Sequence, residues 1–205
     1  TSGGTPHAFL YDGTMHDLGT LGGATSNSTE LNGSGQIVGF SATSGGDTRA
    51  FLYDGSTMHD LGTLGGSNSQ AYGINDSGQV VGVSEISGGN THAFLYDGST
   101  MHDLGTLGGS GSIAYDINNG GTIVGVGATS SGSSHAFLYD GTMHDLGTIA
   151  GGTYSAAYGV NASGEAVGMG FTSTGDTHAF LYDGSTTLDI NDLLTADSLG
   201  WTITE

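Results

Sequence analysis

A seven-residue phrase that returns five times constrains the fold of this chain more than any other feature. The phrase reads HAFLYDG, with Arg replacing the first His in the second copy, and the copies begin at His7, Arg49, His92, His135 and His178. Their starts lie 42, 43, 43 and 43 residues apart. Periods of about 40 to 45 residues are typical of β-propeller blades, in which each repeat forms one small sheet. We therefore expect a series of similar units.

Four short strands are expected within one period. In the second full unit they are predicted at residues 69–75, 79–85, 92–97 and 101–107. Glycine-containing turns follow the first and third strands, and their lengths suit tight antiparallel hairpins. The first of these turns is preceded in successive units by Asn32, Asn75, Asn118 and Asn161. Each unit is thus predicted to be a four-stranded meander.

A four-stranded sheet of this size cannot bury its faces alone, so neighbouring units must stack to form the core. The prediction is all-β: residues 1–205 as a single repeat domain, a five-bladed β-propeller of four-stranded antiparallel meander blades with an incomplete closing blade. Its units are a partial 1–23, then 24–66, 67–109, 110–152 and 153–187, and a closing segment 188–205. The alternative architecture is an open β solenoid of stacked sheets, which the same period permits.

The charge of the chain restricts its partners. Twenty Asp and Glu residues stand against one basic residue, Arg49, which gives a formal net charge of -19. Phosphate backbones and anionic membrane surfaces are bound by clustered Lys and Arg, so we expect no nucleic-acid partner and no membrane association. No apolar run approaches the length of a membrane span, and no cysteine can form a disulfide. Calcium, basic peptides and neutral glycans suit this composition better.

The phrase HAFLYDGTMHDLGTLGG, with the SxAYGINDSGQVVG pattern that follows the glycine pair of a later copy, resembles the HAF family of probable extracellular repeats. That family occurs in bacterial secreted and surface proteins, and the resemblance covers nearly the whole chain. It implies an extracellular or cell-surface location and a propeller-like fold. It implies no established chemistry.

The last residues differ from the repeat and resemble the variant segment near the end of such proteins. We expect a strand there, formed by Trp201, Thr202, Ile203 and Thr204, in the same closing blade as the N-terminal copy of the repeat phrase. The second strand of that blade is missing from the sequence pattern. An exposed sheet edge recruits other chains, so these residues are predicted to be an assembly edge.

The repeated histidines and aspartates invite two interpretations. A residue that recurs in every blade is more typical of structure than of catalysis, so we expect the eight histidines to be hydrogen-bonded within blades; the alternative is a ring of metal ligands. The Tyr-Asp pair at the end of each phrase is expected to cap the next turn. The carboxylates predicted to bind calcium, if it is bound, are Asp17, Asp60, Asp103 and Asp145.

No residue constellation indicates a reaction. A glycosidase would need two facing carboxylates, and the acids outside the repeat pattern, expected to be surface substitutions, are Glu30, Glu85, Asp116, Glu165 and Asp176. We therefore expect a non-enzymatic protein. The first hypothesis is a self-assembling filament or surface-layer subunit, and the second is a secreted propeller that binds a glycan or a protein. Variation between blades concentrates in the first strand and in the loop before the third, where a recognition surface is expected.

Overall fold

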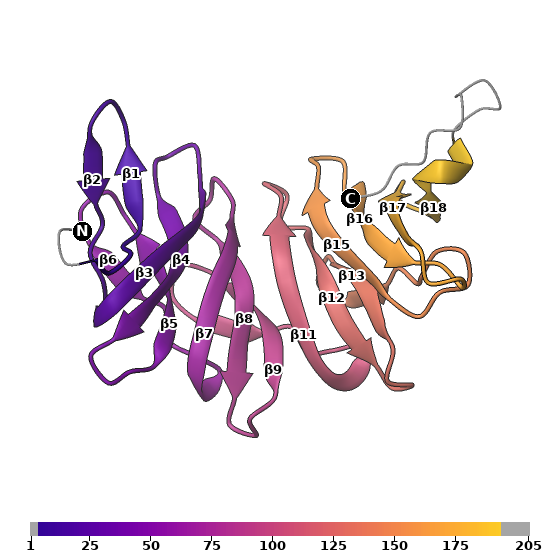
Figure 1. The fold of residues 1–205 in the computed structure, drawn as a ribbon, viewed down its shortest axis with the longest axis horizontal. Helices are drawn as coiled ribbons and strands as arrows, with labels where there is room; N and C mark the ends of the chain where they lie inside the picture. Colours follow the sequence, from indigo (N-terminus) through magenta and orange to yellow (C-terminus); the bar gives the residue numbers. More distant parts are fainter. Residues whose placement is uncertain (1–3, 194–205) are drawn as a thin grey trace. The chain divides into compact units, whose positions relative to one another are not determined.

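The computed structural model describes residues 4–193, which fall into two compact units that divide between Asp103 and Leu104. Every regular element in the described part is a β-strand except one short 3-10 helix. Each unit is a series of small antiparallel sheets, as the arrows in Figure 1 show. The prediction of a single repeat domain over residues 1–205 stays a prediction.

The first unit contains a hairpin and two blades. The N-terminal hairpin consists of β1 (Phe9–Tyr11) and β2 (Met15–Asp17). The first blade consists of β3 (Gly22–Leu31), β4 (Ile37–Thr43), β5 (Thr48–Tyr53) and β6 (Met58–Asp60). The second blade consists of β7 (Gly65–Ile74), β8 (Val80–Ile86), β9 (Thr91–Tyr96) and β10 (Met101–Asp103). In both blades each strand pairs with the next in sequence.

The second unit contains two blades of the same design. The third blade consists of β11 (Gly108–Ile117), β12 (Ile123–Thr129), β13 (Ser134–Tyr139) and β14 (Met143–Asp145). The fourth blade consists of β15 (Ser155–Val160), β16 (Ala166–Phe171), β17 (Thr177–Tyr182) and β18 (Thr187–Asp189). The 3-10 helix η1 (Ile190–Leu193) follows.

The predicted four-stranded meander is confirmed, with corrections at the strand ends. In the second blade the first strand begins at Gly65 rather than at residue 69, and the fourth strand ends at Asp103 rather than at residue 107. The predicted boundary between the last two units is also wrong, because Leu188 and Asp189 lie in β18 and complete the fourth blade. Residue propensity for strands and runs of apolar residues predict the centre of a strand better than its ends, because a terminal glycine can still form backbone hydrogen bonds with the next strand.

A glycine in the second strand makes room for the phenylalanine of each complete blade. The cross-strand pairs are Gly39 with Phe51, Gly82 with Phe94, Gly125 with Phe137, and Gly168 with Phe180. All four phenylalanines are fully buried. At Gly82 an added Cβ would lie 2.9 Å from Cε1 of the Phe94 ring, closer than real side chains approach. The ring therefore packs directly on the backbone of its neighbouring strand.

Candidate functional site

One kind of His-Asp contact joins the start of the third strand of a blade to the end of the fourth. His92 Nδ1 lies 2.9 Å from both carboxylate oxygens of Asp103. Equivalent contacts join His7 to Asp17, His135 to Asp145, and His178 to Asp189. A carboxylate only accepts hydrogen bonds, so Nδ1 carries the donated proton in each pair. These histidines are half-buried and brace the outer strand of the blade.

A second kind of His-Asp contact closes the hairpin between the third and fourth strands. His59 Nε2 lies 2.7 Å from Asp54 Oδ2, and the same contact joins His102 to Asp97 at 2.8 Å. Shorter turns preserve it at 2.9 Å, between His16 and Asp12 and between His144 and Asp140. All eight histidines are thus hydrogen-bonded within their own blade or hairpin, which confirms the structural interpretation.

The aspartate of each Tyr-Asp pair caps its turn, as predicted. Asp54 Oδ1 accepts hydrogen bonds from the backbone N–H groups of Ser56 and Thr57, both at 2.9 Å. The His59 ring and then these donors hold the pKa of Asp54 far below its ordinary value. The same arrangement, led by His102, lowers the pKa of Asp97. Hydrogen bonds to the charged form of a carboxyl favour that form.

The fourth blade keeps the cap but loses the histidine. Leu188 stands in β18 where the other copies have the His of the MHD sequence. Asp183 still accepts from the backbone N–H groups of Ser185 and Thr186 at 2.9 Å. The N–H of Thr186, followed by the Ser185 hydroxyl, lowers the pKa of Asp183 from 3.8 to about 2. The turn therefore stabilises the ionised carboxylate without help from an imidazole.

The four carboxylates predicted to bind calcium lie at equivalent places at the ends of fourth strands. Asp17, Asp103 and Asp145 each face a histidine, and Asp60 accepts a hydrogen bond from the N–H of Gly62 at 2.8 Å. The N–H of Gly19, and then His7, lower the pKa of Asp17. Within residues 4–193 no group of three or more His, Asp or Glu side chains is placed to hold a metal ion. The calcium assignment stays a prediction.

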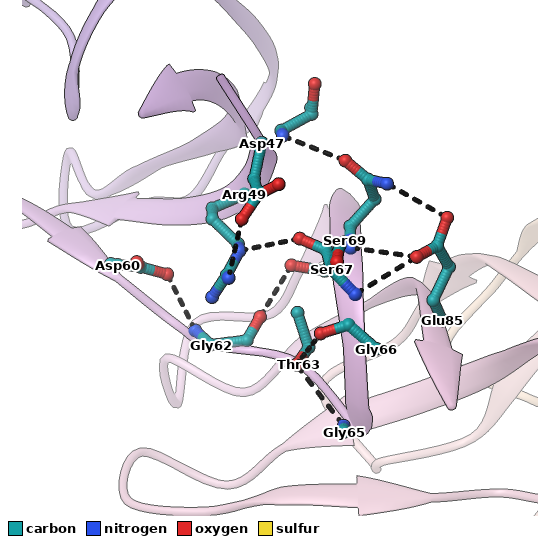
Figure 2. A network of polar contacts seen from close by, with 12 residues as sticks. Asp47, Arg49, Asp60, Gly62, Thr63, Gly65, Gly66, Ser67, Ser69 and Glu85 are labelled. Atoms are coloured by element: carbon teal, nitrogen blue, oxygen red, sulfur yellow. Dashed lines mark hydrogen bonds and ion pairs between the residues drawn. The ribbon is translucent and has the colours of Figure 1, made fainter. Parts of the chain in front are cut away.

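Arg49 changes the pattern where it replaces histidine. Its Nε donates to the carbonyl oxygen of Ser67 at 2.8 Å, and a terminal nitrogen lies 3.3 Å from Asp47. Figure 2 shows that this contact belongs to a wider network that reaches Glu85. The Glu85 carboxylate accepts from the N–H of Ser67 at 3.0 Å and from the Asn68 side chain at 2.9 Å. The Asn68 amide, followed by the Ser67 N–H, lowers the pKa of Glu85.

A serine in the first strand of the first, second and fourth blades was missed as a linking residue. Ser69 accepts the N–H of Ala50 at 2.9 Å and donates to the Gly62 carbonyl at 2.6 Å, so it ties the second blade to the first. Ser26 makes the same pair of contacts with Ala8 and Gly19, and Ser155 makes it with Ala136 and Gly147. The signal was present in the sequence, because these serines share the 43-residue spacing.

Two of the acids expected to be surface substitutions also link blades. Glu30 Oε2 accepts the N–H of Ile74, and Asp116 Oδ2 accepts the N–H of Val160, each at 2.7 Å. Both acids lie beside a register shift in the first strand. Glu30 is exposed, as expected, and Asp116 is half-buried. Each also satisfies a backbone donor on the following blade of the same unit, a role that the sequence analysis missed.

In each unit, the asparagine before the first turn of one blade also links that blade to the next. Asn32 Oδ1 accepts the N–H groups of Ser34 and Gln36, which confirms the predicted turn role. Its side-chain amide donates to the carbonyl of Asn75 at 3.0 Å. In the second unit, Asn118 donates to the carbonyl of Asn161 at 2.8 Å.

The N-terminal hairpin presents the most distinctive surface of the first unit. Among residues 4–193, β1 pairs with β2 alone, whereas β5, β9, β13 and β17 each pair with two strands. Phe9 is 54% exposed, while the equivalent phenylalanines in the four blades are fully buried. A hollow of about 410 Å³ borders it, lined by Pro6, His7, Ala8, Phe9, Met15 and Asp17. Within the described residues, β1 therefore has one open edge, and the Phe9 ring beside it is half exposed.

The predicted assembly residues Trp201, Thr202, Ile203 and Thr204 lie outside the described residues. Among residues 4–193, no helix combines the length and apolar character needed to cross a membrane.

Comparison with known proteins gives a fold and no family. No protein-family model matches the chain, and no curated protein matches it. The acylaminoacyl peptidase of Pyrococcus horikoshii is similar in structure with a TM-score of 0.56 and 16% identity, over 82% of this chain and 27% of the peptidase. The β-propeller domain of the Trilobed protease from Pyrococcus furiosus, described as having an open velcro topology, gives a TM-score of 0.54 and 12% identity.

The second match covers 80% of this chain and 54% of the propeller-domain chain. This chain therefore spans about a quarter and about half of the lengths of these two proteins. At such low identity the likeness concerns the fold and not the activity. The chain is accordingly an all-β repeat protein with the architecture of a β-propeller, and its described part consists of a two-stranded N-terminal hairpin and four-stranded antiparallel blades.

Proposed function

We propose that this protein is an extracellular structural repeat protein that assembles into filaments or layers through an unpaired sheet edge. The observation that carries the proposal is the open side of β1 in the part of the chain that the structure describes. In the first blade the equivalent strand, β5, pairs with β4 over six residues, from Ile37 opposite Tyr53 to Ala42 opposite Thr48. Strand edges without such a partner recruit other chains.

The direction of the backbone groups identifies which donors are available. The Ala8 carbonyl accepts the N–H of Leu18, so it points toward β2. Because successive residues of a strand point their backbone groups to opposite sides, the N–H groups of Phe9 and Tyr11 point to the open edge. An added strand would bind these donors as β4 binds those of β5.

The same proposal assigns no catalytic role. The histidine and aspartate side chains form nearly the same two pairs from blade to blade, whereas a catalytic centre requires a constellation that occurs once. The extracellular location rests on the resemblance of the repeat phrase to the HAF family. The net charge of -19 keeps separate copies apart by repulsion, so added salt or divalent cations should favour assembly.

The test is light scattering and negative-stain imaging across protein concentration, with calcium and with a chelator. Assemblies that grow with concentration support the proposal, and their loss on chelation would place a cation at the contact. Tyr11→Pro removes one outward N–H and should weaken assembly without unfolding the blades. Compact monomers in every condition would rule the assembly role out.

A second candidate function, binding of a small glycan, is favoured by one hollow in the first unit. Its volume is about 340 Å³, and it is lined by Pro6, His7, Thr25, Ser26, Asn27, Phe40, Ala42 and Thr48. One repeat later, Asn68 and Glu85 occupy the places of Thr25 and Ala42 and bind each other. The smaller side chains leave the space between the hairpin and the first blade open. A mixture of amide, hydroxyl and aromatic groups suits a sugar.

Calorimetric titration with a panel of neutral oligosaccharides tests this candidate. The double substitution of Thr25→Asn with Ala42→Glu rebuilds the filled arrangement of the next repeat and should abolish binding. Binding that survives this filling would place the ligand elsewhere.

A further inference from the structure

The blades of each unit pack through two unlike faces. Between the first and second blades, Val38 and Ala50 of the first pack against Val80 and Phe94 of the second, all with no exposed surface. Between the third and fourth blades, Val124 and Ala136 form a cluster with Ala157, Ala166 and Phe180. A blade therefore presents its phenylalanine toward the preceding blade and a valine of its second strand toward the following one.

We use the names phenylalanine face and valine face for these two sides. The hairpin follows the same rule where it meets the first blade, since Ala8 and Leu18 pack against Ile37 and Phe51. Every contact of this kind within a unit therefore joins a valine face, or its hairpin counterpart, to a phenylalanine face. The geometry is directional, from one blade to the next along the chain.

Within residues 4–193, the hairpin and the fourth blade each expose residues of one such face. On the phenylalanine face of the hairpin, Phe9 is 54% exposed, and Met15 is also exposed. On the valine face of the fourth blade, Val167 is 50% exposed. The counterparts of Val167 in the first and third blades, Val38 and Val124, have no exposed surface. Phe9 and Val167 thus correspond to the two sides of the packing that recurs between blades inside each unit.

We infer that the valine face of one copy binds the phenylalanine face of a second copy, so that blades continue head to tail from chain to chain. This inference rests on the proposed assembly role and names its contact as face-to-face packing. A contact between two different faces is heterologous and can close a ring or extend a filament.

Two charge substitutions test the inference, because each blocks one face and leaves the other intact. Phe9→Asp blocks the phenylalanine face, and Val167→Asp blocks the valine face. Both residues are half exposed, so both variants should keep the circular dichroism and melting temperature of the parent. Ser131→Asp, at an exposed turn, is the charge-matched control and should assemble like the parent.

Sedimentation velocity should find each face variant monomeric at concentrations where the parent assembles. A central interface residue carries at least about 2 kcal/mol, which corresponds to roughly thirtyfold weaker association. An equal mixture of the two face variants should form dimers and nothing larger, since one open face of each kind remains. Assemblies that persist in both variants would overturn the face-to-face contact and leave assembly through the edge of β1. A parent that stays monomeric would overturn the assembly role itself.

Discussion

Glu30 Oε2 accepts a hydrogen bond from the backbone N–H of Ile74 at 2.7 Å, across 44 residues of sequence. Asp116 does the same for Val160 in the second unit, also across 44 residues. The first strand of each blade shifts register, and these carboxylates satisfy a backbone donor near the shift in the neighbouring blade. In the second and fourth blades a glycine, Gly73 or Gly159, occupies the position of the acid. The two units therefore share an acid-then-glycine arrangement.

Removal of the Asp116 carboxylate should destabilise the second unit. Asp116→Ala leaves the Val160 N–H without its acceptor, and hydrogen bonds to charged groups contribute about 1.5–3 kcal/mol. The free energy of unfolding should fall by that amount in urea titrations. Asp176→Ala is the control. Among the described residues, this carboxylate accepts a hydrogen bond only from the nearby Thr174 hydroxyl, so its loss should lower the free energy of unfolding much less. Equal losses in the two variants would contradict the inter-blade role.

Removal of the Ser69 hydroxyl, which links the first two blades, should also destabilise the first unit. Ser69→Ala deprives both the buried N–H of Ala50 and the carbonyl of Gly62 of a partner. We expect a loss of about 1–3 kcal/mol, the cost of leaving a buried polar group unsatisfied. Ser67→Ala, on the same strand with an exposed side chain, should be close to neutral. Thermal unfolding of the two variants measures the difference, and equal melting temperatures would contradict the linking role of Ser69.

A methyl group at Gly82 should be poorly tolerated. Gly82→Ala places Cβ against the backbone of β7 and 2.9 Å from the Phe94 ring, so strands must separate. Overpacking of a tight core costs about 1–3 kcal/mol. Gly88→Ala is the matched control, since nothing lies within 4 Å of its added Cβ and its φ is not left-handed. A Gly82 variant as stable as the control would mean that the ring moves aside freely.

Low pH should remove the stability that the ionised Asp183 carboxylate gives to the folded state. Its pKa is about 2 in the folded chain against an ordinary 3.8, so the folded state favours the ionised form. The resulting stability is fully present above pH 3.8 and is lost as the pH falls through about 2. Asp183→Asn keeps an acceptor oxygen but cannot titrate, so its melting temperature should fall less steeply in that window. Parallel curves for the parent and Asp183→Asn would contradict the prediction.

The repeat period was enough to predict the blades, because a fixed spacing of hairpin signals defines a meander whatever its neighbours are. It was also enough to identify the structural histidines. Asp189 was missed although it follows His178 by 11 residues, the same spacing that separates His92 from Asp103. The altered sequence around it hid a residue that makes the same contact.

Contacts between blades could not be predicted in the same way. Glu30 and Asp116 look idiosyncratic in sequence because their partners are backbone N–H groups, which carry no residue signature. The exposure of Phe9 and Val167 was likewise hidden, because both belong to phrases that are buried elsewhere. What differs is the presence of a covering strand or blade, a property of stacking rather than of local sequence.

The turn between the third and fourth strands exists in two lengths, and both close with the same partners. Asp12 and His16 meet across the shorter form, and Asp54 and His59 meet across a form one residue longer. The repeats thus already differ by one residue in this turn and keep the Asp–His hydrogen bond that closes it. For protein engineering these turns are natural grafting positions, where a foreign peptide could be displayed once per blade at a spacing set by the scaffold.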